Sequence, residues 1–211
     1  MREKEAEKML LYIIRHGESE ANAGGYHSGQ SCVHLTERGR KQAACTREYV
    51  KDIPFDRLFV SDVLRTQETA EVIFPGMERT FIPLAREIDN TTMHGKTKEE
   101  MTELYGQAYL DCREKFDYAP LGIECESLAH LSGRAKKLLA WAEKQEDERI
   151  CIVSHAGFIV ALAGQVLGLE AHSRALLCDN ASVSVFEFKN GKWRLKLWNF
   201  TQEDKKNIQA R

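Results

Sequence analysis

The chain has 211 residues, enough for one well-buried domain and too few for two ordinary domains to be the default expectation. Hydrophobic residues make up 43% and charged residues 29%, the balance of a soluble globular protein, and the formal net charge of −2 gives no sign of a polyanion-binding protein. The longest early apolar run, residues 9–14, is too short for a signal core or a membrane span. We therefore expect a single cytoplasmic domain over residues 1–211, with a polar tail after about residue 200 and no membrane or nucleic-acid partner.

Short apolar runs alternate with helical patterns in the first half of the chain. In chain order, we expect a strand at 10–14, a helix over 36–51, a strand at 58–60, a helix over 61–73 and a strand at 81–82. Thr36 is placed to cap the first of these helices, and either Ser61 or Asp62 is placed to cap the second.

The second half continues the alternation and closes with a hairpin. In chain order, we expect a helix from residue 97, an amphipathic helix over 127–142, a strand at 150–153, a buried helix over 157–169 and hairpin strands at 183–188 and 193–197. Thr97 and Glu100 have capping-box spacing, and Asn190-Gly191 is a strong type I′ turn signal. This order predicts an α/β fold, a three-layer α/β/α sandwich with a mainly parallel sheet.

In such sheets the functional site lies beyond the carboxyl ends of the strands. The residues that follow the predicted strands are Arg15, His16, Arg65, Glu87 and His155, and Ala156 and Gly157 then begin a helix whose amides can donate to an anion. Arginine forks match phosphate oxygens, neutral imidazole is a nucleophile near pH 7, and a carboxylic acid can protonate a leaving alkoxide. Each residue alone is more often structural, so the prediction of a phosphoryl-transfer site depends on their occurrence together.

The strings Arg15-His16-Gly17-Glu18-Ser19 with Asn22, Ser61–Ala70 and Val153–Gly157 together resemble the histidine phosphatase superfamily, in its phosphoglycerate mutase-like branch. The resemblance covers nearly the whole chain, and it implies that His16 is phosphorylated and that Glu87 acts first as general acid and then as base. It implies a phosphoryl-binding set of Arg15, Arg65, His155 and Asn22. To these we add Ser28, which stands where the family frequently has Gln, and Ala156, whose backbone amide begins a helix. It implies no metal and no organic cofactor.

Several loop positions depart from the family's usual pattern. Cys32-Val33-His34-Leu35 stands where the family usually has Asp-x-Pro-Leu, and His94 stands where Glu is common. His34 and His94 are therefore candidate pocket residues, although ordinary loop histidines are the simpler interpretation. The spacing of His27, Cys32 and His34 matches no ordinary zinc site, and we expect the six scattered cysteines to be reduced thiols.

The leading hypothesis is a phosphomonoester hydrolase that acts on a small phosphorylated metabolite through a phosphohistidine. A phosphoglycerate mutase is the first alternative, but family mutases carry a longer insertion between the acid and the second histidine, and no spare segment separates Glu87 from His155. A non-catalytic phosphate-binding domain is the second alternative, and it has no need for an intact His16. Sugar phosphates, nucleotides, phosphoglycolate-like acids and cofactor precursors all stay candidate substrates, and nothing in the sequence predicts an oligomeric state.

Overall fold

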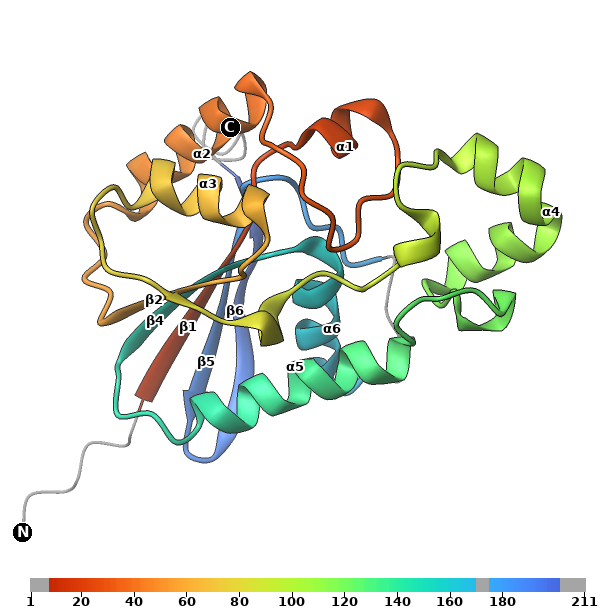
Figure 1. Cartoon of the computed structure of the whole chain (residues 1–211). Coiled ribbons are helices and arrows are strands. Elements are labelled where there is room, and N and C mark those ends of the chain that lie inside the picture. The colour runs from red at the N-terminus through yellow and green to blue at the C-terminus, as the bar shows by residue number, and fades with distance from the viewer. Residues whose placement is uncertain (1–7, 170–174, 202–211) are drawn as a thin grey trace, which may run out of the picture.

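One sheet organises the chain, and its strands lie in the order β3-β2-β4-β1-β5-β6 (Figure 1). The computed structural model describes residues 8–169 and 175–201. The strands are β1 Lys8–Arg15, β2 Arg57–Val60, β3 Thr80–Phe81, β4 Arg149–Ser154, β5 Val183–Lys189 and β6 Lys192–Phe200. The pairs β1–β4, β4–β2 and β2–β3 are parallel, whereas β5 runs antiparallel to β1 and β6 runs antiparallel to β5. The predicted mainly parallel sheet with a terminal hairpin is confirmed, and the carboxyl ends of β1, β2 and β4 meet at one edge.

Helices cover both faces of this sheet, which confirms the predicted three layers. The helices are α1 Glu20–Gly24, α2 Glu37–Val50, α3 Leu64–Ile73, α4 Lys98–Lys115, α5 Leu128–Ala142 and α6 Ala156–Leu167. α2 and α3 lie over one face and α5 and α6 over the other (Figure 1). Successive side chains of β1 alternate between the two cores, with Leu11 and Ile13 against α5 and α6 and Ile14 against α2 and α3. The central strands β1, β2 and β4 are covered on both faces, which explains why they are apolar runs without polar alternation.

The helix starts follow the sequence signals with one exception. Thr36 and Ser127 accept hydrogen bonds from the backbone of the third residue after them, and Thr97 forms a complete capping box with Glu100. The prediction for α3 was wrong, because its N-cap is Val63, which makes no side-chain capping bond. The hydroxyl of Ser61 instead lies 2.9 Å from a ring nitrogen of His155.

Some predicted segments differ in extent from those observed. The helix predicted from residue 97 is α4, which reaches Lys115 and is interrupted by non-helical backbone at Gly106. Asn190 and Gly191 both have positive φ, as a type I′ turn between β5 and β6 requires. The predicted polar tail lies outside the described residues from residue 202 onward.

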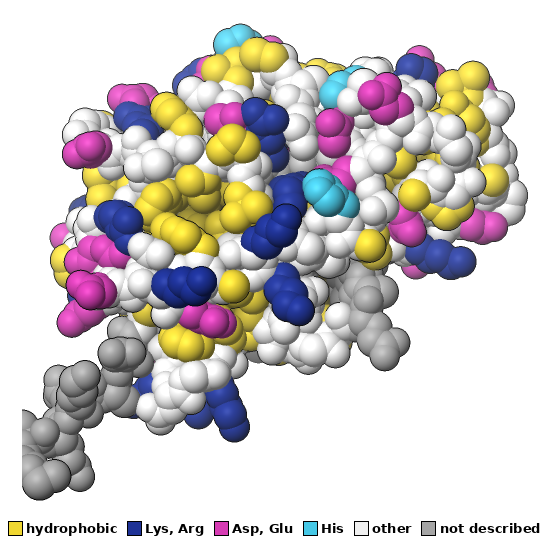
Figure 2. All heavy atoms as spheres, turned by 60° about the horizontal axis from the view of Figure 1, so that its bottom comes forward, with side chains coloured by type: hydrophobic (Ala, Val, Ile, Leu, Met, Phe, Trp, Pro, Cys, Tyr) yellow, Lys and Arg dark blue, Asp and Glu magenta, His cyan; other side chains and the backbone are white. Residues whose placement is uncertain are grey.

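α4 lies apart from the two helical layers, beyond the carboxyl edge of the sheet (Figure 1). A small separate core supports it, made of Met93, Met101, Tyr109, Cys112 and Tyr118. On the face shown in Figure 2, acidic and basic side chains are interspersed with hydrophobic ones, in line with the near-neutral net charge. Within residues 8–169 and 175–201, no helix has the length and apolar character needed to cross a bilayer.

Candidate active site

Two histidines meet at the carboxyl edge of the sheet because their strands are parallel neighbours. His16 follows β1 and His155 follows β4, and the preceding residues Arg15 and Ser154 are paired in register. The ring centroids of His16 and His155 are 5.2 Å apart. Both residues are buried. Strand pairing thus brings together two side chains that are far apart in the sequence.

The guanidinium of Arg65 lies between the two imidazoles. It enters from the first turn of α3 and is only 1% exposed. Its Nε donates to Nε2 of His16 at 3.1 Å and its Nη2 donates to Nδ1 of His155 at 3.0 Å. The carbonyl oxygens of Gly29 and Ser31 accept from it at 2.6 and 3.3 Å. Burial lowers the pKa of Arg65 to about 10, so the side chain still carries its positive charge at neutral pH.

The hydrogen bonds define one tautomer for each histidine. Nδ1 of His16 is 2.7 Å from the carbonyl oxygen of Gly17, which can only accept, so Nδ1 carries the proton and Nε2 presents a lone pair. Nδ1 of His155 accepts from Arg65, so its Nε2–H donates to the hydroxyl of Ser61. Burial, followed by the charges of Arg65 and Arg15, lowers the pKa of His16 well below its ordinary value. Burial and Arg65 do the same to the pKa of His155, so both rings are neutral near pH 7.

Close backbone packing fixes His16 in place. A Cβ on Gly17 would lie 2.4 Å from the carbonyl oxygen of Gly39 in α2, so only glycine permits this approach. The carbonyl oxygen of His16 accepts from the amide of Ala181 at 3.1 Å and from the side chain of Asn180 at 3.2 Å. Sequence reasoning missed Asn180, because it lies in a loop with no motif around it.

Arg15 points toward the same place from the end of β1. Its Nη1 donates to the carbonyl oxygen of Cys178, and its Nε is buried without a hydrogen-bond partner. A buried charged N–H group is normally paired, so this atom has unused capacity for an anionic acceptor. The side-chain oxygen of Asn22 is committed to three contacts of 3.1 Å, with the amide and hydroxyl of Ser19 and the amide nitrogen of Asn180. Of the Asn22 side chain, only the amide nitrogen Nδ2 is left to donate to a phosphoryl group.

Glu87 approaches the site from the segment after β3. Its Oε2 accepts from the amide of Gly157 at 3.1 Å, and its Oε1 accepts from its own neighbour Ile88 at 2.9 Å. The Gly157 amide that we expected to serve an anion is therefore engaged by this carboxylate, which suits the positive end of α6. Ala156 is the first residue of α6, and Ser28 directly precedes Gly29, whose carbonyl oxygen holds Arg65.

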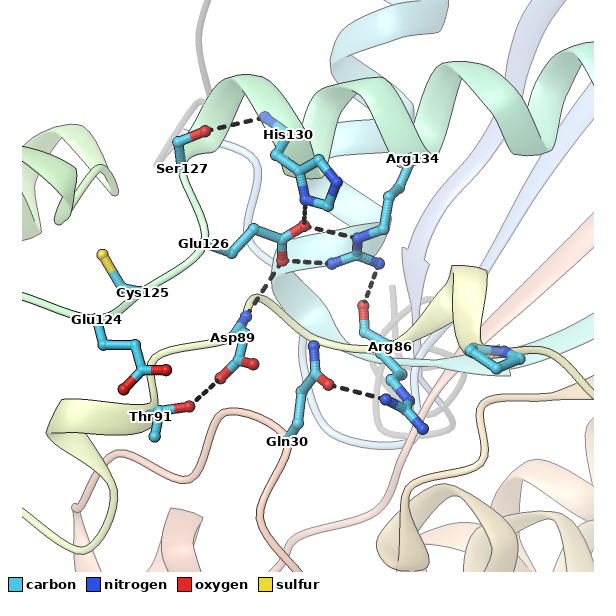
Figure 3. A pocket seen from close by; sticks show the side chains of 11 residues that line it. Gln30, Arg86, Asp89, Thr91, Glu124, Cys125, Glu126, Ser127, His130 and Arg134 are labelled. Atoms are coloured by element: carbon cyan, nitrogen blue, oxygen red, sulfur yellow. Dashed lines mark hydrogen bonds and ion pairs between the residues drawn. The ribbon is translucent and has the colours of Figure 1, made fainter.

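An ion pair between Arg134 and Glu126, side chains that are 11% and 5% exposed, lies against the segment that carries Glu87, and Figure 3 shows the pair and its contact with Arg86. Arg134 in α5 binds the carboxylate of Glu126 through two bonds of 2.7 Å and also donates to the carbonyl oxygens of Leu84, Arg86 and Glu87. Arg86, Glu126 and Arg134 are among the residues that line a hollow of about 510 Å³. The sequence pattern of α5 indicated an amphipathic helix and gave no signal for this contact.

The two loop histidines have different surroundings. His34 is exposed and pairs with Glu68 at 2.7 Å, which places it in a surface ion pair. His94 packs beside Gly29, and its Nε2 is buried without a hydrogen-bond partner. Among the described residues, no three His, Cys, Asp or Glu side chains are grouped so that they could hold a metal ion.

Comparison with known proteins decides the family. The profile of the histidine phosphatase superfamily (branch 1) matches residues 11–201. The chain belongs to this superfamily. A histidine phosphatase relative from Photorhabdus laumondii, named "Probable phosphoglycerate mutase GpmB", is 32% identical over 197 residues, which are 90% of each chain.

Solved histidine phosphatase structures share the fold. The alpha-ribazole phosphatase from Shigella flexneri aligns with a TM-score of 0.82 at 26% identity, covering 91% of this chain and 96% of that one. A mycobacterial glucosyl-3-phosphoglycerate phosphatase aligns with a TM-score of 0.80 at 28% identity, covering 92% of this chain and 100% of that one. The names of these relatives divide between phosphatases and a mutase, so membership of the superfamily leaves both reactions open.

Proposed function

We propose that this histidine phosphatase hydrolyses small phosphomonoesters through a phosphohistidine on Nε2 of His16. The observation that carries the proposal is the orientation of that nitrogen. The hydrogen bond from Nδ1–H to the carbonyl oxygen of Gly17 leaves the lone pair on Nε2, and Nε2 faces the buried, positively charged guanidinium of Arg65. A neutral nucleophile beside a fixed positive charge is what attack on a phosphoryl dianion requires.

In the first step, Nε2 of His16 attacks phosphorus in line with the ester oxygen. The bond from nitrogen to phosphorus forms, the phosphorus–oxygen bond breaks, and the leaving alkoxide takes a proton from the carboxylic acid form of Glu87. Arg15 and Arg65 neutralise the charge on the equatorial oxygens. Once the phosphoryl group replaces Arg65 at Nδ1 of His155, that neutral ring takes its other tautomer, in which Nδ1–H donates to a phosphoryl oxygen and Nε2 accepts from the Ser61 hydroxyl. Arg65 gives up its contact with Nε2 of His16 as the phosphoryl group enters.

In the second step, water attacks the phosphohistidine and the carboxylate of Glu87 takes a proton from it. The nitrogen–phosphorus bond breaks, inorganic phosphate leaves, and His16 returns to its neutral form. Throughout both steps Nδ1–H of His16 keeps its acceptor at 2.7 Å, the carbonyl oxygen of Gly17, which stabilises the positive charge on the phosphorylated ring.

The test is phosphate release from a panel of phosphomonoesters without added metal or bisphosphorylated primer. We expect a subset of esters to be hydrolysed, and His16→Ala to remove both hydrolysis and the acid-labile phosphoryl group on the enzyme. His34→Ala is the matched control, because His34 is exposed in a surface ion pair, and it should keep wild-type turnover.

Two outcomes would favour the alternatives. Primer-dependent isomerisation of a phosphoglycerate without net phosphate release would make the protein a mutase, as the name of the Photorhabdus laumondii relative suggests for that protein. Tight phosphate binding with no phosphorylated enzyme would make it a non-catalytic binding domain. Normal turnover in His16→Ala would refute the phosphohistidine mechanism.

A further inference from the structure

An open depression of about 270 Å³ lies directly beside the candidate acid. The residues that line it are Phe116, Ala156, Gly157, Val160, Leu176, Leu177 and Cys178. Gly157 connects it to the site, since a Cβ there would lie 2.3 Å from Oε1 of Glu87 and 3.0 Å from Cζ of Phe116. The carboxylate of Glu87 and the ring of Phe116 therefore lie side by side over the start of α6.

The depression also adjoins the phosphoryl-binding groups. The carbonyl oxygen of Cys178, one of its lining residues, accepts from Nη1 of Arg15. Ala156 follows His155 directly. A phosphomonoester held by Arg15 and His155, with its ester oxygen at Glu87, would have its organic part at this depression.

The described lining residues carry no charged side chain. Burial raises the pKa of the Cys178 thiol to about 11, so that group is neutral at physiological pH. Leu177 contributes an exposed apolar side chain, with 67% of its surface accessible. A hydrocarbon group would bind more favourably by covering these side chains, because apolar surface would be removed from water. A carboxylate placed against them would lose its hydrating water without gaining a hydrogen-bond partner.

We propose that this depression is the leaving-group site and that it selects phosphomonoesters whose organic part is apolar, such as alkyl and aryl phosphates, over phosphorylated hydroxy acids. This inference rests on the proposed phosphatase function and adds the chemical class of the substrate. It also gives Leu177 and Phe116 the role of specificity residues, since they supply the apolar contact beside the scissile bond.

The experiment compares kcat/KM for ethyl, butyl and hexyl phosphate with that for 3-phosphoglycerate. The three alkyl esters have leaving alcohols of nearly equal acidity, so the chemical step is matched and only the apolar contact changes. Full burial of one methylene is worth about fourfold, and the depression is open, so we expect a rise of about twofold per methylene. 3-Phosphoglycerate should be a poorer substrate than hexyl phosphate.

Variants assign the effect to the depression. Leu177→Ser should reduce the ratio of kcat/KM between hexyl and ethyl phosphate to near one, and the high exposure of Leu177 argues against a folding defect as the cause. Leu104→Ser is the matched control, because Leu104 is 59% exposed on α4 and lies outside the depression, and it should keep the wild-type ratio.

The failures are distinguishable. Hydrolysis with equal kcat/KM for all chain lengths, or a preference for 3-phosphoglycerate, would overturn the apolar leaving-group site and leave the phosphatase proposal standing. Absence of hydrolysis of any ester, together with absence of a phosphorylated His16, would refute the phosphatase proposal and the inference with it.

Discussion

Replacement of Arg134 by alanine should destabilise the fold strongly, although Arg134 lies outside the proposed reacting groups. The side chain of Arg134 is 11% exposed and that of its partner Glu126 is 5% exposed. Burial acts to raise the pKa of Glu126, but the hydrogen bonds and charge of Arg134, together with hydrogen bonds from the Asp89 amide and His130, outweigh it and hold the pKa below the ordinary value. Without Arg134, the carboxylate of Glu126 would be buried without its main partner.

The magnitude follows from the groups left behind. Removal of one partner from a buried ion pair costs about 3–5 kcal/mol, and the three backbone carbonyls that lose a donor place this case near the middle of that range or above it. A loss of about 4 kcal/mol corresponds to a fall of roughly 8–16 °C in the thermal midpoint for a chain of this size.

The assay is urea and thermal unfolding of wild type, Arg134→Ala and Arg79→Ala. Arg79 pairs with Glu71, which is 63% exposed, so its loss should cost less than about 1 kcal/mol. Arg134→Lys should recover only part of the stability, because an ammonium cannot reproduce the planar fork. If Arg134→Ala and Arg79→Ala have the same free energy of unfolding, the Glu126–Arg134 pair does not stabilise the Glu87 segment as argued.

Four further predictions concern catalysis and pH. Arg65→Ala should lower turnover at least about 100-fold, measured as phosphate release at saturating substrate, because it removes a transition-state donor and the group between the two histidines; a loss below tenfold would contradict that role. Glu87→Gln should impair esters with poor leaving groups most, so a plot of turnover against leaving-group acidity should steepen, and an equal loss across the series would remove Glu87 from the acid role. The pKa of His16 is lowered, so the proposed nucleophile stays neutral down to pH values below about 6.5 and the acid limb of kcat/KM should lie below that value. His16 and His155 bind protons more readily in the unfolded chain than in the folded protein, because their pKa values are lowered by folding. They should therefore not affect the free energy of unfolding above about pH 6.5, and they should reduce it as the pH falls below that value. Urea midpoints measured across an acid titration test this.

Local signals in the sequence determined most of the framework. The apolar runs at 10–14, 58–60 and 150–153 became buried strands, and capping residues such as Thr36 and Ser127 began helices where expected. These features could be predicted because hydrogen bonds and side-chain periodicity within a few residues decide them. The parallel arrangement then placed the residues after the strands at one edge, which is why the sequence alone was sufficient to group Arg15, His16 and His155.

Tertiary contacts decided the rest. Ser61 has the sequence context of a helix cap, yet its hydroxyl meets His155, a residue that only the pairing of β2 with β4 brings near. The tautomer of His16 depends on where the carbonyl oxygen of Gly17 points, and the contacts of Asn180 and Arg134 join segments far apart in the chain. The apolar lining beside Glu87 likewise combines Phe116, which directly follows α4, with α6 and the loop before β5. No local pattern encodes such contacts, because their free energy is gained only when distant segments are packed together.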